Sequence, residues 1–202
     1  MQNIDLQAVA ETLTKKLFVE LEASGRHVHV TKEQAQALFG HELTEKRPLS
    51  QLGQYLSNER VTVMGPKGEL RNVAVLGPER KDGQVEISMT DGRALGITPP
   101  VRLSGDLEGT PGCVLVGSAG SVKLDHGVIV ARRHIHMSPE DAAAMGVEDR
   151  QKVKLQVYTD RPVIFEDVTV RIDPYATTSV HLDYDEANAC GFRTGDLGRI
   201  LP

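Results

Sequence analysis

Two short stretches of the chain each carry a pair of histidines two residues apart. His27 and His29 are separated by a valine, and His134 and His136 by an isoleucine. On a β-strand, side chains two residues apart point to the same face, so each pair presents two imidazoles together. Imidazole suits zinc among the common intracellular metals. A single pair would be read as a half-buried polar strand, but two copies in register favour a metal site.

The two histidine pairs belong to an internal repeat. Both occur in the pattern Arg-His-aliphatic-His-apolar-hydroxyl-x-Glu-x, and both lead into Ala-rich sequence. A second correspondence downstream aligns Glu86 with His181, and both residue types are metal ligands. We therefore expect two related halves of roughly 100 residues, with Glu86 and His181 as the candidates for the third ligand. The corresponding segments are 26–34 with 133–141, and 85–96 with 180–191.

The elements that must position these side chains are mostly short strands. Runs of β-branched residues bounded by turn sequences predict strands at residues 61–64, 72–76, 85–87, 113–116, 128–130, 153–157, 168–172 and 179–182. Helices are few: Thr31, Ser138 and Asp185 are predicted N-caps, with Pro139 at a first helical position and Gly191 closing the last helix. Short strands at even spacing are typical of small barrels. The predicted fold is mainly β, with two related small β-barrels capped by short α-helices and an N-terminal helical extension.

Composition narrows the function classes. The 202 residues carry 23 Lys and Arg against 28 Asp and Glu, a net charge of −5, which disfavours a general nucleic-acid binder. No apolar run approaches the roughly 20 residues of a membrane span, and the N-terminus lacks the pattern of a secretory signal. Cys113 and Cys190 are too few for a disulfide framework, and neither has a neighbouring base in the sequence. We expect a cytoplasmic protein that binds neither nucleic acid nor membrane and whose thiols are buried.

Three arginines lie close to the candidate ligands in the sequence. Arg80 precedes Glu86 by six residues, and a guanidinium group matches phosphate oxygens in a bidentate fork. The same residue is equally consistent with a solvated charged turn. Arg26 and Arg133 each precede a histidine, where they either orient a metal ligand from outside the metal's own shell or extend along the surface.

A series of motifs along the chain matches one family. The motifs are residues 26–30, 49–54, 61–68, 75–80, 84–88, 99–106, 133–142, 181–183 and 185–188. With them, the chain resembles the PduL-type phosphate acyltransferases, the phosphotransacylases of bacterial microcompartments, over about residues 20–202. No matched position is altered.

The resemblance implies a reaction. Such an enzyme transfers a short acyl group, acetyl or propanoyl, reversibly between coenzyme A and inorganic phosphate, giving acyl phosphate and free CoA. Arg80 matches the family's phosphate-contacting arginine and is the expected catalytic and phosphate-binding residue. We expect direct attack on the thioester by phosphate held by metal and Arg80, with no covalent acyl-enzyme.

The resemblance also implies two metal ions per chain. Zinc is expected, although other divalent metals fit the same donors. The ligands that it implies are His27, His29 and Glu86 for one ion, and His134, His136 and His181 for the other.

The resemblance divides the chain into four parts. Residues 18–25 would form a first strand that pairs with the C-terminal barrel, 26–131 the first metal-binding barrel and 132–202 the second. Residues 1–17 have apolar residues at helical spacing and would form an amphipathic extension, which either packs locally or serves as an encapsulation peptide for a shell protein. We expect a homo-oligomer in the bacterial cytoplasm, within the lumen of a microcompartment.

Two other functions fit the same residues. A dinuclear zinc hydrolase acting on thioesters or phosphoesters would use the ligands to activate water in place of phosphate. A zinc-stabilised structural or shell-associated module would need closed four-ligand sites, whereas three candidate ligands per half favour open ones.

Overall fold

The computed structural model describes residues 7, 14 and 17–201 and has the predicted mainly β fold. The chain divides into two compact units. One, the barrel unit, comprises residues 1–23, 133–182 and 186–202. The other, the sheet unit, comprises residues 24–132 and 183–185. No helix within the described part of the chain is both long enough and apolar enough to span a membrane.

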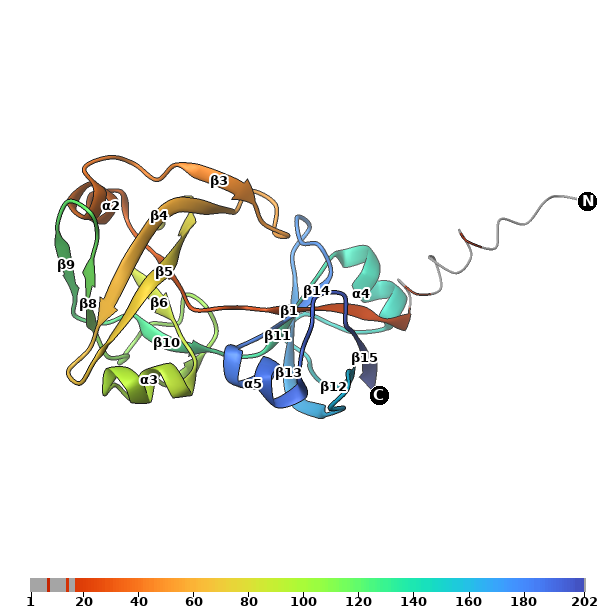
Figure 1. The fold of residues 1–202 in the computed structure, drawn as a ribbon. Coiled ribbons are helices and arrows are strands. Elements are labelled where there is room, and N and C mark those ends of the chain that lie inside the picture. Colours follow the sequence, from red (N-terminus) through yellow and green to blue (C-terminus); the bar gives the residue numbers. More distant parts are fainter. Residues whose placement is uncertain (1–6, 8–13, 15–16, 202) are drawn as a thin grey trace, which may run out of the picture. The chain divides into compact units, whose positions relative to one another are not determined.

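In the barrel unit, six of the described strands close into a barrel (Figure 1). Their order around the barrel is β1 (Val19–Ala23), β14 (Ser179–Leu182), β11 (His134–Met137), β13 (Ile164–Ile172), β12 (Lys152–Tyr158) and β15 (Leu197–Leu201). Helices α4 (Pro139–Met145) and α5 (Tyr184–Cys190) follow β11 and β14 directly in the sequence.

The N-terminal strand β1, red in Figure 1, completes this barrel. It pairs in parallel with β14 and antiparallel with β15, so strands from the two ends of the chain lie side by side. Val19 and Leu21 are buried in the core of the barrel unit. Because side chains alternate along a strand, Glu22 points to the face opposite Leu21.

The sheet unit is an open, curled sheet rather than a closed barrel. Along it, the described strands run in the order β7 (Val101–Arg102), β10 (Val128–Ala131), β6 (Gln84–Glu86), β2 (His27–His29), β5 (Glu69–Gly77), β4 (Tyr55–Met64), β8 (Cys113–Val116) and β9 (Ser121–Leu124). Strand β3 (Glu45–Pro48) pairs with the N-terminal part of β4, residues 55–57. Helices α2 (Lys32–Phe39) and α3 (Met89–Leu95) follow β2 and β6.

Local capping chemistry explains where the helices begin. The Thr31 hydroxyl accepts from the N–H of Gln34, and the Gln34 side chain accepts from the N–H of Thr31, which forms a capping box. Ser138 caps α4 in the same position of the repeat, with Pro139 at the first helical residue. Both of these predicted caps are confirmed.

One predicted cap is wrong, and one helix was missed. Helix α5 begins at Tyr184, so Asp185 lies inside the helix; its carboxylate instead accepts a hydrogen bond from the N–H of Thr90 at 2.9 Å. Helix α3 has its own capping box, between Ser88 and Asp91. A glycine at its centre, which disfavours helix, conceals α3 in the sequence.

In each unit, the apolar residue between the two histidines anchors the histidine strand in the core. Val28, between the two histidines of β2, is fully buried in the apolar cluster of the sheet unit. Ile135 holds the equivalent position in β11 and is fully buried in the barrel core. The alternation predicted from the sequence is therefore present, since the apolar side chain of each strand anchors it while the two imidazoles face the other way.

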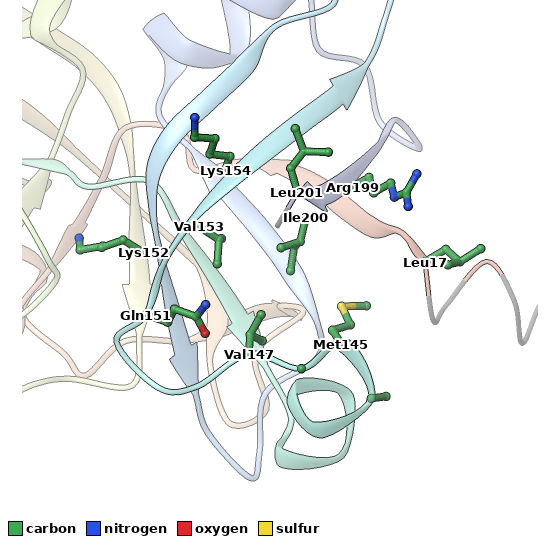
Figure 2. Close-up of a pocket in the computed structure, with 12 residues that line it drawn as sticks. Leu17, Met145, Val147, Gln151, Lys152, Val153, Lys154, Arg199, Ile200 and Leu201 are labelled. Carbon is green, nitrogen blue, oxygen red and sulfur yellow. The ribbon is translucent and has the colours of Figure 1, made fainter.

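A surface cavity of about 480 Å³ lies on the barrel unit, between the end of α4 and strands β12 and β15 (Figure 2). Leu17, Met145, Val153 and Ile200 are among the residues that line it, with lysine and arginine side chains at its edge. None of the candidate metal ligands lines this cavity.

Candidate metal centres

Strand pairing builds the first candidate centre, in the sheet unit. β2 and β6 are antiparallel, and their register places His27 directly opposite Glu86. Directly opposite residues on one face have Cβ atoms about 5 Å apart, so the carboxylate meets the imidazoles. The ligand atoms of His27, His29 and Glu86 all lie within 4.8 Å of one another, and all three residues are buried. We call this group cluster one.

The rings of cluster one are held in a defined orientation. His27 Nδ1 lies 2.8 Å from the carbonyl oxygen of Gly25, which can only accept, so Nδ1 carries the proton. The other ring nitrogen, Nε2, then faces Glu86, with Oε2 at 3.5 Å. Burial lowers the pKa of His27, but the charge and hydrogen bond of the Glu86 carboxylate, together with the hydrogen bond to Gly25, leave this pKa above its ordinary value.

His29 provides a direct test of whether a metal fits. Its side chain is almost fully buried, and among the described residues Nδ1 has no hydrogen-bond partner. Burial, together with the positive charges of His27 and Arg80, holds the pKa of His29 well below its usual range. A neutral imidazole is the form that binds a metal ion.

The second candidate centre, cluster two, has the same construction in the barrel unit. β11 and β14 are antiparallel, and the register places His134 opposite His181. The ligand atoms of His134, His136 and His181 lie within 4.8 Å of one another, and the Nε2 atoms of His134 and His136 are 3.0 Å apart. In both units the first histidine of the strand therefore faces the third candidate ligand, as the internal repeat indicated.

Both clusters fit zinc. Two ligand atoms at about 2.1 Å from an ion, at a tetrahedral angle, lie about 3.4 Å apart. The distances of 3.0 Å in cluster two and 3.5 Å in cluster one bracket that value. Each cluster supplies three donors, which is the number that leaves a coordination position for substrate or water.

Arg80 lies beside cluster one. Its N–H donates to the carbonyl oxygen of Val30 at 2.8 Å, which ties the residue to the end of the histidine strand. Its side chain donates through Nη1 to the Ser104 hydroxyl at 3.1 Å. The guanidinium charge is close enough to help lower the pKa of His29 and to oppose, in part, the rise in the pKa of His27. The structure therefore places a partly buried cation beside the three ligands rather than in a solvated turn.

Sequence reasoning missed two residues that connect Arg80 to the ligands. The buried amide of Gln84 donates to Oε1 of Glu86 at 2.5 Å and to the Ser104 hydroxyl at 2.9 Å. The N–H of Gly105 donates to the Gln84 carbonyl oxygen at 2.8 Å, which fixes the orientation of the amide. Ser104 is thus shared between Arg80 and Gln84. A polar residue two positions before Glu86, on the same strand face, was the available signal.

A third missed residue, Glu22, lies beside cluster two. Its Oε2 is 3.3 Å from Nε2 of His181, across the parallel pair of β1 and β14. No local sequence pattern reveals this contact, because it depends on the N-terminal strand inserting beside the strand that carries His181.

Two arginines and two cysteines remain among the candidates from the sequence. Arg26 and Arg133 lie outside the ligand sets and form ion pairs with Asp91 and Glu186 respectively. The two cysteines are buried free thiols, and burial raises the pKa of Cys113 to about 12. At that pKa the thiol is not a nucleophile near neutral pH.

Comparison with known proteins identifies the family. The family model for phosphate propanoyltransferase matches residues 20–193. The phosphate propanoyltransferase of Listeria monocytogenes is 52% identical over all of this chain and 97% of its own length. Those of Enterococcus faecalis (55% identical, 90% of this chain, 87% of the relative) and Clostridioides difficile (48% identical, 100% of this chain, 99% of the relative) are similarly close. The chain belongs to the phosphate propanoyltransferase family and is an acyltransferase.

Proposed function

We propose that this acyltransferase moves an acetyl or propanoyl group reversibly between coenzyme A and inorganic phosphate. The products in one direction are acyl phosphate and free CoA. Membership of the phosphate propanoyltransferase family supports the pair of co-substrates. The observation that carries the proposal is Arg80, a partly buried cation fixed beside a three-ligand cluster.

Two zinc ions per chain are part of the proposal. His27, His29 and Glu86 would hold one, and His134, His136 and His181 the other. Zinc bound there would supply a Lewis acid for a thioester carbonyl and a soft partner for a thiolate. The three-donor sets, their spacing and the neutral ring of His29 support this assignment.

The residues of the chain contribute orientation and charge. The Arg80 guanidinium presents its fork to phosphate and offsets the repulsion between an anionic nucleophile and a developing negative charge. Ser104 accepts from Arg80 and so restricts its rotamers, which reduces the entropy cost of holding phosphate. Gln84 donates to Glu86 and to the same hydroxyl, so phosphate holder and metal ligand are held by one network.

Substitution of Arg80 tests the phosphate assignment. Arg80→Ala is expected to lower kcat/KM for phosphate by about 10²–10³-fold, the usual cost of removing a group that stabilises charge in a transition state. Arg80→Lys keeps the charge but loses the bidentate fork, so an intermediate loss is expected. Zinc content, measured by atomic absorption, should stay that of the wild type.

The matched control is Arg71→Ala. Arg71 is an exposed arginine of the same unit, paired with Glu69, and its loss should leave the kinetics unchanged. An Arg80→Ala enzyme with wild-type kcat/KM for phosphate would remove Arg80 from the proposed reaction.

We also propose that residues 1–17 direct the enzyme to the lumen of a bacterial microcompartment by docking on a shell protein, and that the enzyme is a homo-oligomer. Apart from residues 7, 14 and 17, this segment lies outside the described residues. The apolar residues at helical spacing support a docking role, and neither cluster draws a ligand from the segment.

A further inference from the structure

Each histidine strand is preceded by an arginine that forms an ion pair. Arg26 Nη2 lies 3.0 Å from Oδ1 of Asp91, and Arg133 Nη1 lies 2.6 Å from Oε1 of Glu186. The two acids occupy the same place in the repeat, because Asp91 follows Glu86 by five residues and Glu186 follows the third ligand of cluster two by five. The same contact therefore occurs independently in both units.

These contacts join segments that flank paired strands, and no local turn fixes the register of those strands. β2 and β6 are separated by more than fifty residues, and β11 and β14 by about forty, so no hairpin turn sets their alignment. A slip of one residue in either pair would turn the third ligand to the core face. A slip of two would move it by about 6.6 Å, beyond the reach of the metal.

The ion pairs are placed where they oppose such a slip. Asp91 lies in the first turn of helix α3, which begins three residues after Glu86, and its side chain is only 6% exposed. Besides pairing with Arg26, its Oδ2 accepts from the N–H of Ser88 at 3.3 Å, so the arginine is bound to the start of the helix itself.

The barrel unit repeats the arrangement with one more contact. Glu186, in α5, has a side chain 17% exposed and pairs with Arg133. Arg133 also donates through Nε to the carbonyl oxygen of Glu166 in β13, at 2.7 Å. Its guanidinium thus connects the start of β11 to the parallel strand on one side and to the helix that follows β14.

We propose that Arg26–Asp91 and Arg133–Glu186 are positioning pairs, each of which holds the third ligand of its own metal centre opposite the histidine pair. The inference rests on the proposed zinc centres, and each pair acts on one centre only. Loss of an outer-shell partner of this kind typically lowers metal affinity about 10- to 100-fold.

The test measures zinc affinity at one centre at a time, by competition with a chromophoric chelator. His136→Ala leaves only the first centre, and His29→Ala leaves only the second. In the His136→Ala background, Arg26→Gln is expected to lower zinc affinity about 10- to 100-fold, whereas Arg133→Gln leaves it unchanged. In the His29→Ala background, the two arginine variants should exchange their effects.

Further variants separate positioning from a general effect on folding. Asp91→Asn should cause the same loss as Arg26→Gln at the first centre, and the double variant should lose no more than either, because both remove one interaction. Arg26→Lys should restore part of the affinity. Arg193→Gln, which breaks an exposed ion pair with Asp160 (2.8 Å), is the control and should leave both centres unchanged.

The outcomes distinguish the inference from the function on which it rests. Wild-type affinity in Arg26→Gln and Arg133→Gln would overturn the positioning pairs while leaving the zinc centres in place. Equal losses at both centres, together with a lower melting temperature of the metal-free variant, would also overturn them, because the role would then be stability alone. A wild-type chain that binds no zinc would overturn the centres and the inference together.

Discussion

His29 lies at the most constrained point of cluster one. Its ring is almost fully buried, and its Nδ1 has no hydrogen-bond partner within the described part of the chain. Burial, His27 and Arg80 all disfavour the imidazolium and lower the pKa of His29, so the ring is neutral near pH 7. A neutral imidazole is the protonation state that binds a metal ion.

Replacing His29 with alanine should therefore remove one zinc and leave the other. We expect zinc content to fall from two ions per chain to one, because cluster two draws no ligand from the sheet unit. Zinc should also raise the melting temperature of the variant less than that of the wild type. The matched control is His41→Ala, since His41 is exposed and outside both clusters. Two tightly bound ions in His29→Ala would contradict the ligand assignment.

The buried thiols give a second prediction at the residue scale. Burial raises the pKa of Cys113 to about 12 and also raises the pKa of Cys190. At about pH 8 the thiolate fraction of Cys113 is then about one in 10⁴. The native enzyme should react slowly with thiol reagents, and Cys113→Ala should retain activity. Loss of turnover in Cys113→Ala, with the fold and zinc content intact, would contradict this prediction and support a covalent acyl-enzyme mechanism.

At the scale of single strands and helices, part of the site could be predicted from the sequence. His27 with His29, and His134 with His136, follow from strand periodicity alone, since residues two apart share a face. The repeat adds the third candidate ligand of each cluster, Glu86 in cluster one and His181 in cluster two. Local patterns of this kind also predicted the caps at Thr31 and Ser138, because a cap depends on residues within one turn.

What the sequence could not predict depends on contacts between distant segments. The side-chain network of Gln84 and Ser104 joins a strand to a loop about 20 residues away. Glu22 meets cluster two only because β1 inserts between β14 and β15. Closure of the barrel also depends on a distant segment, because β1 closes the barrel unit. The described strands of the sheet unit form an open, curled sheet.

Truncation tests the role of β1 as a barrel element. Deleting residues 1–16 should leave the fold and the specific activity unchanged. Deleting residues 1–23 also removes Val19 and Leu21 from the core and takes from β14 and β15 the strand that joins them, so the barrel is open between them. Burial of two such side chains contributes about 3–6 kcal/mol, so urea unfolding of the shorter chain should show at least that loss. Equal unfolding free energies for the two truncations would show that β1 does not stabilise the barrel.

At the scale of the whole molecule, two similar frameworks hold different donor sets. With a divalent ion, cluster one would carry a net charge of +1, because Glu86 is a carboxylate, whereas three neutral imidazoles leave cluster two at +2. Arg80 adds a positive charge beside cluster one. On a chain whose net charge is −5, each centre would therefore be a local concentration of positive charge within its own unit, which favours an anion.

The most direct test is thiol release from propanoyl-CoA and acetyl-CoA by the zinc-replete enzyme, with and without inorganic phosphate, together with identification of the acyl product. We expect release that requires phosphate and forms acyl phosphate in an amount equal to free CoA. We also expect added acyl phosphate and CoA to regenerate the thioester. Release that proceeds equally without phosphate and yields the free acid would contradict the proposed transfer to phosphate and identify a thioester hydrolase.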